Sequence, residues 1–398
     1  MNRIDTNILS KYCYESETTR DWLAHLEKTH LTNTELKAER YSDAIMVPDE
    51  GRLEAFSGGV FDANGQAIKG SFQRGGLLTA EKLRQNLDAE EPEMLNEEIV
   101  YLGQYRNQWG SFLVDSVSRL WYALDCNENC KFAFLATQQV LGGIHPNTWK
   151  FLNALGIKEN QIYYITKPTR VKKLIIPEMS FVPYGTVAVT DHEQIPRYHR
   201  AYLDTIYRVT DCIGNINIDV HEKVYFSRSK FSKKSRTDFG EDLIVRMLQE
   251  NNFYIVYPEE HSLEEQIFYV NTCKVFASIG GSCAHNIVFS KTRPQMILFN
   301  RMNGFQWHQW MLDEMAKVEP ITYVDMYCEP FKAWFKTTLS GPYLYLINKN
   351  VTRFAADYHF VLPTEATAFR KKTRVVCDYT LQIVRTIVGR IYHAIIGH

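Results

Sequence analysis

The sequence predicts an α/β protein with two parallel-sheet domains that face one another. Apolar runs alternate with helical runs along most of the 398 residues, and this alternation pauses near 195–220 and then restarts. The strand-like runs are continuous rather than alternating in polarity, which is typical of parallel strands covered on both faces. We therefore expect domains over residues 1–210 and 211–330, followed by a helical tail over 331–398.

The elements of the first domain follow from these patterns. Residues 1–40 are polar and helical in character, as in "TRDWLAHLEKTH", and residues 52–75 indicate short strands with a turn at "ANGQ". Three longer strands and two helices come next: the strands are expected at 99–105, 131–137 and 161–166, and the helices at 111–124 and 146–155.

The second domain repeats the alternation. Its strands are "KVYFSR", "YIVYP", "VFASIGG" and "QMILFN", which begin at residues 223, 254, 275 and 295. Helices are expected at 240–252, at 262–272 and between the last two strands.

Composition excludes several classes of protein. Hydrophobic residues make up 45% and charged residues 23%, as in a globular protein, and the net charge of -1 argues against a general nucleic-acid binder. The eight cysteines have no paired ligand spacing, so we expect no metal and no other cofactor. No signal-peptide core and no run of about 20 apolar residues is present, which favours a cytoplasmic location with free thiols.

A cluster of positive charges follows the first strand of the second domain. The loop "SRSKFSKKSR" holds Arg228, Lys230, Lys233, Lys234 and Arg236. These like charges repel one another, so the loop requires either a negative partner or water. Parallel sheets bind ligands at the carboxyl ends of their strands, which is where this loop lies. A solvated surface turn is the alternative for the basic loop taken alone.

A glycine loop, "IGGSCAHN", follows a later strand of the same domain and is expected at the same edge. Gly280 and Gly281 let the backbone approach a ligand, Ser282 and Asn286 add polar donors, and a helix N-terminus follows. The two loops together predict a phosphate or diphosphate site. The chain has no "GxxxxGK[ST]", "GxGxxG" or Asp-x-Asp motif, which favours a metal-independent transferase over a P-loop or dinucleotide-binding protein.

Three blocks of sequence resemble glycosyltransferase family 61: "NQWGSFLVDSVSRLW" at 107–121, "SRSKFSKKSR…GED", and "SLEEQIFYVNTCKVFASIGGSCAHNIVF". The resemblance covers roughly residues 50–310. It implies a GT-B-like fold of two Rossmann-like domains facing a cleft, an inverting mechanism and a nucleotide-sugar donor. On this resemblance, the domain over 1–210 takes the acceptor and the domain over 211–330 binds the donor.

The chain also departs from the family. Ser111 stands where many members have a His, and the His that leads the glycine loop in many members is absent, while His285 lies later in that loop. A non-catalytic relative that binds a nucleotide sugar or a glycan is therefore the alternative to an enzyme. A phosphotransferase or nucleotide hydrolase is a third, weaker alternative.

The candidate residues fall into three groups. Asp115 is the candidate general base, although a surface ion pair with Arg119 is the simpler interpretation. Ser111 and Arg119 are assigned to the acceptor side. The donor side is assigned Arg228, Arg236, Lys234, Glu241, Glu265, Gln266, Gly280, Gly281, Ser282, His285 and Asn286.

Two of the donor-side carboxylates have structural alternatives. Glu241 is also a first-turn Glu favoured by the helix dipole. Glu265 is also the third residue of a "SLEE" capping box that begins at Ser262.

The C-terminal tail predicts a basic amphipathic helix. Its apolar stripe consists of Val376, Leu381, Ile383, Val384, Ile387, Val388, Ile391, Ile395 and Ile396, and it is flanked by Arg370, Lys371, Lys372, Arg374, Arg385 and Arg390. Such a helix suits peripheral contact with the inner face of a membrane. Packing within the protein and assembly into a homo-oligomer remain open as alternatives.

The sequence as a whole predicts an inverting, metal-independent glycosyltransferase. It would move a hexose or pentose from a nucleotide-diphosphate donor to a hydroxyl of a growing surface glycan, such as capsule, exopolysaccharide or lipopolysaccharide. The acceptor would be a glycan or a lipid-linked glycan.

Overall fold

The computed structural model describes residues 13–14, 30–48, 58–72, 92–136, 143–183, 197–230, 237–302, 307–332, 335 and 341–396. These residues form two compact units. Unit 1 holds the described residues between 30 and 215, and unit 2 holds those from 216 onward together with residues 13–14. The alternation of helices and strands in both units confirms the α/β class.

Unit 2 is built on a six-stranded sheet in which every pair of neighbours is parallel. The strand order is β1-β16-β15-β14-β11-β13. The strands are β1 (Cys13–Tyr14), β11 (Lys223–Phe226), β13 (Tyr254–Val256), β14 (Val275–Ile279), β15 (Gln295–Asn300) and β16 (Ile321–Asp325). The four predicted strands are confirmed. The prediction of helix over residues 1–40 was wrong at β1, whose backbone extends the sheet beside β16.

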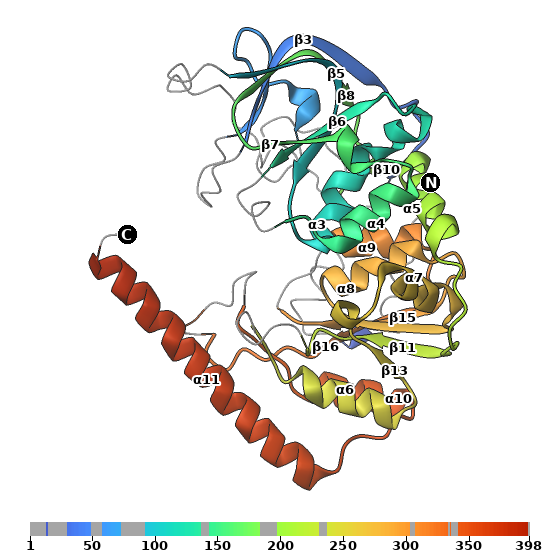
Figure 1. The fold of residues 1–398 in the computed structure, drawn as a ribbon. Helices are drawn as coiled ribbons and strands as arrows, with labels where there is room; N and C mark the ends of the chain where they lie inside the picture. The colour runs from blue at the N-terminus through green and yellow to red at the C-terminus, as the bar shows by residue number, and fades with distance from the viewer. Residues whose placement is uncertain are drawn as a thin grey trace. The chain divides into compact units, whose positions relative to one another are not determined.

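The helices of unit 2 cover both faces of this sheet, as Figure 1 shows. The helices α6 (Glu241–Glu250) and α10 (Lys349–Asp357) lie on one face, and their apolar side chains form one core with alternate residues of β11, β14 and β15. The helices α7 (Leu263–Thr272), α8 (Ser282–His285) and α9 (Trp307–Met315) lie on the other face, and η10 (Asn286–Phe289) continues α8.

Residues beyond 330 contribute to unit 2 rather than only trailing from it. The short strand β17 (Tyr343–Leu344) pairs in parallel with β12 (Asp238–Phe239). The long helix α11 (Glu365–Ile396) packs on this pair, and its Tyr379 and Ile383 are buried in a small core that also contains Leu243. The segment predicted as a tail therefore shares a core with the domain before it.

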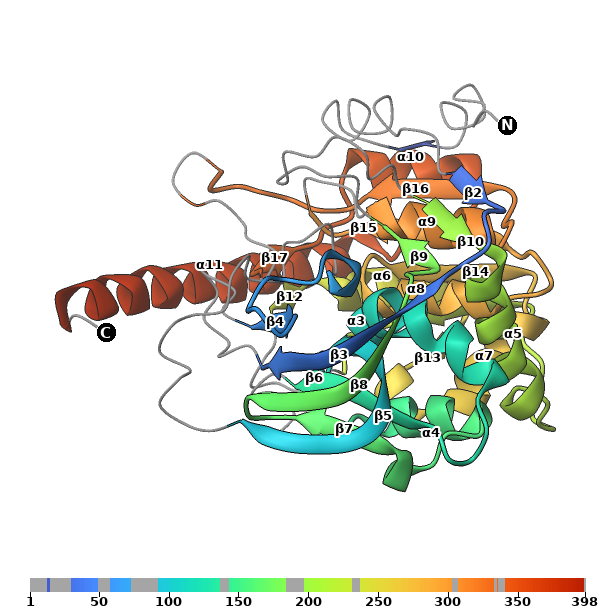
Figure 2. The same ribbon diagram turned by 90° about the horizontal axis from the view of Figure 1, so that it is seen from above.

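Unit 1 contains a mixed six-stranded sheet in the order β4-β3-β8-β5-β6-β7. Its strands are β3 (Ala38–Val47), β4 (Gly59–Phe61), β5 (Glu93–Tyr105), β6 (Lys131–Ala136), β7 (Ile162–Ile165) and β8 (Thr169–Pro177). Figure 2 shows β3, β8, β5, β6 and β7 side by side. The expectation of an all-parallel first sheet was wrong, because β3 runs antiparallel to both β8 and β4.

Smaller elements complete unit 1. A three-stranded sheet joins β2 (His30–Thr32), β10 (Arg197–His199) and β9 (Phe181–Val182). The helices are α4 (Pro146–Ala154) and α5 (Arg200–Ile213), and single turns occur at η1 (Lys69–Ser71) and η7 (Glu159–Gln161). The predicted helix at 146–155 and the turn at "ANGQ", which precedes the bridge from Phe61 to Ala67, are both confirmed.

The predicted helix at 111–124 is helical but not α-helical. A single turn α3 (Trp109–Ser111) leads into a π-helical segment η4 (Phe112–Ser116) and then a 3₁₀ segment η5 (Val117–Asp125). The 3.6-residue period therefore does not apply, and the interpretation that placed Asp115 and Arg119 on the surface was wrong. The polar residues Asp115 and Arg119 are 2% and 0% exposed, whereas Leu124 is 39% exposed.

Arg119 is a structural cation inside unit 1. Its guanidinium donates to the carbonyl oxygens of Pro177, Gly70 and Phe72 at 2.9–3.0 Å and lies over the ring of Tyr101. Burial lowers the pKa of Arg119 to about 10. These contacts replace the surface ion pair with Asp115, and a role on the acceptor side stays a prediction.

We expect Arg119→Ala to destabilise the protein by about 3 kcal/mol or more, because three carbonyl groups lose their donor inside the core. Urea unfolding followed by circular dichroism measures this change. Arg40→Ala removes an exposed arginine of the same unit and should change the free energy of unfolding by less than about 0.5 kcal/mol. Equal effects of the two substitutions would contradict the structural role of Arg119.

Candidate functional site

The candidate site lies at the carboxyl edge of the unit 2 sheet, where the chain changes direction. The strand β11 pairs with β13 on one side and with β14 on the other. Its following helix α6 lies on one face of the sheet, and α8, which follows β14, lies on the opposite face (Figure 1). Doubly wound sheets bind ligands at this kind of topological switch point.

The loops that follow β11 and β14 meet at Gly281. A Cβ atom at this position would lie 2.9 Å from Arg228 Nη1 and 3.5 Å from Arg301 Cζ. Gly281 also has a φ of +135°, a conformation that side chains with a Cβ rarely adopt. The glycine therefore lets two guanidinium groups approach the backbone, and the predicted meeting of the two loops is confirmed.

Arg301 is a functional candidate that the sequence analysis missed. It follows β15 directly, so the rule that selected Arg228 at the carboxyl end of β11 would also have selected it. Its guanidinium stacks over the ring of Tyr343, 4.8 Å from the ring centroid, and Tyr343 is itself parallel to Tyr345. An aromatic face under a guanidinium holds its plane in place while its N–H groups stay available at the edge.

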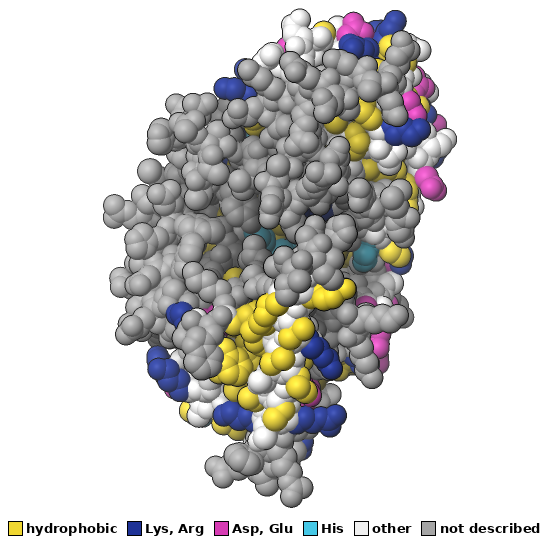
Figure 3. Space-filling model, turned by 90° about the vertical axis from the view of Figure 1, so that its left-hand side faces the viewer, with side chains coloured by type: hydrophobic (Ala, Val, Ile, Leu, Met, Phe, Trp, Pro, Cys, Tyr) yellow, Lys and Arg dark blue, Asp and Glu magenta, His cyan; other side chains and the backbone are white. Residues whose placement is uncertain are grey.

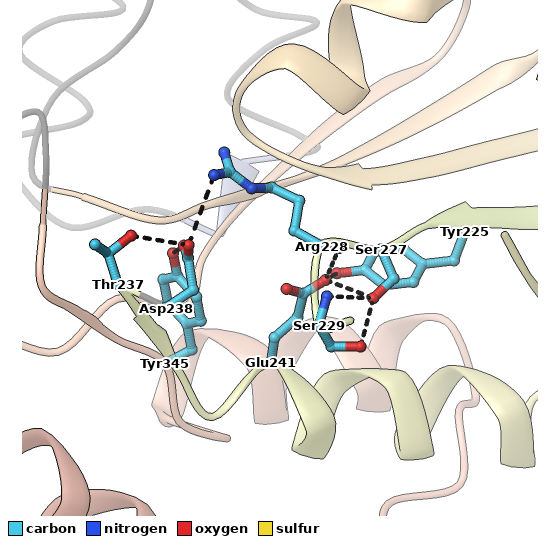
Figure 4. A network of polar contacts seen from close by, with 8 residues as sticks. All are labelled: Tyr225, Ser227, Arg228, Ser229, Thr237, Asp238, Glu241 and Tyr345. Carbon is cyan, nitrogen blue, oxygen red and sulfur yellow. Dashed lines mark hydrogen bonds and ion pairs between the residues drawn. The ribbon is translucent and has the colours of Figure 1, made fainter. Parts of the chain in front are cut away.

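Arg228 is held from behind by a carboxylate. Its Nη2 lies 3.7 Å from Asp238 Oδ2, and Asp238 also accepts hydrogen bonds from Thr237 Oγ1 and from the Tyr345 hydroxyl (Figure 4). Burial disfavours the charge of Arg228, but Asp238 and other nearby acidic groups outweigh it and raise the pKa of Arg228. The arginine is therefore charged at every physiological pH.

Gly240 makes this arrangement possible. It lies between Asp238 on β12 and the first residue of α6, and it has a φ of +98°. A Cβ atom here would lie 2.2 Å from the Tyr345 carbonyl oxygen, so β12 and β17 could not pair as they do. The Gly240 of the "GED" sequence thus lies in close contact with the Tyr345 backbone, and Asp238 and Glu241 lie before and after it in the chain.

Glu241 lies under the loop that carries Arg228. One carboxylate oxygen, Oε1, accepts hydrogen bonds from Tyr225, from Ser227 Oγ and from the Arg228 backbone N–H at 2.8–3.0 Å (Figure 4). The other oxygen, Oε2, is buried and has no hydrogen-bond partner among the described residues. Burial is the largest effect and raises the pKa of Glu241 to about 7, against the lowering effect of these hydrogen bonds.

We expect Glu241→Gln to flatten the pH dependence of stability. Because the pKa is raised in the folded state, protonated Glu241 stabilises the fold, and this stability is lost as pH rises from the ordinary value of 4.5 through about 7. Between pH 4 and 8, the free energy of unfolding of Glu241→Gln should rise by about 3 kcal/mol relative to that of the wild type.

Denaturant unfolding at a series of pH values measures this change. Asp313 is a second buried carboxyl whose pKa burial raises to about 7, so a slope of the same sign should persist in the variant. Glu250→Gln, at the exposed end of the same helix, is the matched control and should follow the wild type.

The remaining donor-side candidates differ in their exposure and in their contacts. Arg236 and Lys234 lie outside the described residues. Lys230, in the same basic loop, is exposed and pairs with Glu260 at 2.8 Å. Gly280 donates its N–H to the Phe299 carbonyl, and Ser282 begins α8 half-buried. His285 is buried with its ring 4.8 Å from that of His308.

Glu265, Gln266 and Asn286 bind groups of the protein itself. Ser262 and Glu265 exchange both hydrogen bonds of a capping box, which confirms the structural alternative for Glu265. The Gln266 amide donates to the carbonyls of Pro258 and His261, and its oxygen accepts from Asn286. This network fixes the loop after β13 against α7 and η10.

Asp115, the candidate base in unit 1, lies in the π-helical segment η4, and Ser111 lies just before this segment. The Ser111 hydroxyl donates to Gln108 at 3.4 Å. The buried Tyr202 hydroxyl donates to the carbonyl oxygen of Leu113, two residues before Asp115, and burial raises the pKa of Tyr202. Single π-helical turns are frequent at functional sites.

Within the described ranges, no group of three or more His, Cys, Asp or Glu is placed to hold a metal ion. At the carboxyl edge of unit 2, the guanidinium groups of Arg228 and Arg301 both lie close to Gly281, and we call this pair the candidate anion site.

The fold and the two arginines define an α/β protein with a candidate anion-binding site at a topological switch point. The family model of glycosyltransferase 61 matches residues 109–297, just under half of the chain, and spans Asp115, Arg228 and Gly281. This match confirms the resemblance to the family that the sequence motifs indicated. A search of curated proteins found no match.

Proposed function

We propose that the protein is an inverting, metal-independent glycosyltransferase that uses a nucleotide-diphosphate sugar as donor. The observation that carries this proposal is the convergence of Arg228 and Arg301 on Gly281 at the switch point of unit 2. Two fixed guanidinium groups can make bidentate contacts with phosphate oxygens. They would offset the negative charge that develops on the diphosphate as it leaves.

The transfer needs a general base on the opposite face of the donor sugar, and we assign this role to Asp115. In this proposal the two units form a GT-B-like pair that faces a cleft, with the acceptor on unit 1 and the donor on unit 2. Asp115 removes the proton of the acceptor hydroxyl, the oxygen attacks the anomeric carbon, and the bond to the diphosphate breaks. Attack from the face opposite the leaving group inverts the configuration.

The acceptor in this proposal is a hydroxyl of a growing surface glycan, free or lipid-linked, and the transferred sugar is a hexose or a pentose. The glycan belongs to a capsule, an exopolysaccharide or a lipopolysaccharide. The protein would act in the cytoplasm or at the inner membrane face. None of the helices among the described residues is long and apolar enough to cross a membrane.

A non-catalytic relative that binds a nucleotide sugar or a glycan is the second candidate. Two observations favour it: Ser111 stands where many family members have His, and the Asp115 side chain is only 2% exposed in unit 1. Such a protein would keep the arginine site on unit 2 but would not release nucleoside diphosphate.

The proposal is tested first by a thermal-shift and calorimetry screen against UDP, GDP, CDP, CMP, TDP and their common sugars, with and without EDTA. We expect one nucleotide to stabilise the protein selectively and independently of EDTA. Release of nucleoside diphosphate from the selected sugar then separates an enzyme from a binding protein. Failure of every nucleotide to bind would remove the basis for the donor site.

A further inference from the structure

The helix α11 carries two apolar faces, and folding uses only one of them. Its inner face holds Tyr379 and Ile383, which are 1% and 5% exposed. The Tyr379 ring lies parallel to that of Phe331 and edge-on to that of Phe239, so this face anchors the helix on unit 2. A helix that needed only to pack on its own domain would be polar on the other side.

The other side is instead apolar and exposed. We call it the outer face of α11; it consists of Leu381, Val384, Ile387, Val388, Ile391 and Tyr392, which are 38–60% exposed. These are six of the eleven large hydrophobic side chains that are exposed among the described residues, so the exposure is concentrated on a single helix. Figure 3 shows the hydrophobic side chains as a continuous band. Such a band marks an interaction surface rather than scattered surface residues.

The charge around this band indicates its partner. The segment Glu365–Ile396 contains six Arg or Lys residues and two Asp or Glu residues. Arg385 and Arg374 are exposed, and Figure 3 shows Lys and Arg side chains on both sides of the hydrophobic band. A second copy of the same helix would bring like charges together. An anionic lipid surface offers an apolar layer for the outer face and negative headgroups for the arginines.

We propose that the outer face of α11 is a membrane-docking surface that lies in the plane of an anionic lipid bilayer. The helix then rests with Leu381, Val388 and Tyr392 in the interfacial layer, while Tyr379 and Ile383 keep it attached to unit 2. This inference goes beyond sugar transfer and does not depend on it. A docked transferase would, however, meet lipid-linked acceptors at the surface that holds them.

The test uses the full chain and sedimentation with vesicles of phosphatidylcholine alone or mixed with phosphatidylglycerol. We expect binding to the mixed vesicles, and weak binding to phosphatidylcholine alone. The combined substitutions Val384→Ser, Val388→Ser and Ile391→Ser should reduce the partition coefficient at least tenfold. The matched control is Val220→Ser with Val361→Ser, two exposed valines of unit 2 outside α11, which should bind as the wild type does.

Charge is tested separately by Arg374→Gln and Arg385→Gln, each of which should weaken binding to the mixed vesicles about fivefold at low salt. Thermal melts of all variants show whether they are folded. The proposal is overturned if the wild type does not bind mixed vesicles, if it binds both vesicle types equally, or if the valine control loses binding as the triple variant does. Light scattering tests the alternative that a second copy of the chain covers the outer face. A wild-type dimer that the triple variant abolishes would assign the outer face to this second copy and overturn the proposal.

Discussion

An Asp115→Asn variant is expected to lose sugar transfer by a factor of about 10²–10⁴ while it keeps its affinity for the donor nucleotide. The amide has nearly the shape of the carboxylate but cannot accept the proton of the acceptor hydroxyl. Because the proposed donor contacts belong to unit 2, nucleotide binding should not change. Release of nucleoside diphosphate with acceptor present measures the loss, and calorimetry measures the affinity.

The burial of Asp115 makes a structural control necessary. Asp125→Asn changes an exposed carboxylate at the end of the same helical region and should leave both transfer and stability within about twofold and 0.5 kcal/mol of the wild type. If Asp115→Asn lowers the melting temperature and the nucleotide affinity together, the carboxylate serves the fold of unit 1 and another residue is the base. Full activity in the variant would contradict the assignment outright.

Removal of either guanidinium group from the anion site is expected to weaken nucleotide-diphosphate binding by a factor of about 10–100, because charge-assisted hydrogen bonds to phosphate contribute about 1.5–3 kcal/mol each. Arg301→Ala tests the residue that the sequence analysis missed, and Arg228→Ala tests the one that it predicted. The loss should be smaller for the corresponding nucleoside monophosphate, which has fewer phosphate oxygens to contact. Calorimetric titration of both nucleotides gives the two affinities.

Lys230→Ala is the matched control for this pair. It removes a cation from the same basic loop, but Lys230 is exposed and already paired with Glu260, so binding should fall by less than about threefold. Gly281→Ala tests the geometry, since its Cβ atom would occupy the position that Arg228 approaches and would require a φ of +135°. If Lys230→Ala weakens binding as much as either arginine variant, the site is a diffuse basic surface and not a pair of fixed arginines.

Local sequence patterns predicted the strands and the helix cap that depend on residues close together in the chain. The continuous apolar runs at β11, β13, β14 and β15 are each strands in the structure, because a strand buried on both faces needs apolar side chains at successive positions. The capping box at Ser262 is also local, since its two hydrogen bonds join residues three apart. The meeting of the loops at Gly281 followed from these strands and from the geometry of parallel sheets.

Other features depended on contacts between residues far apart in the chain. Tyr343 and Tyr345 contact Arg301 and Asp238 only because β17 pairs with β12, more than 100 residues earlier, and no local pattern marks them. The π-helical turn at Asp115 and the burial of Arg119 arise from packing that overrides an apparently amphipathic α-helix. The sequence by itself therefore determined the strands β11, β13, β14 and β15, the resemblance to glycosyltransferase family 61 and one arginine of the candidate site. Tertiary structure decided which distant side chains surround that arginine, because their positions depend on strand pairing and not on neighbouring residues.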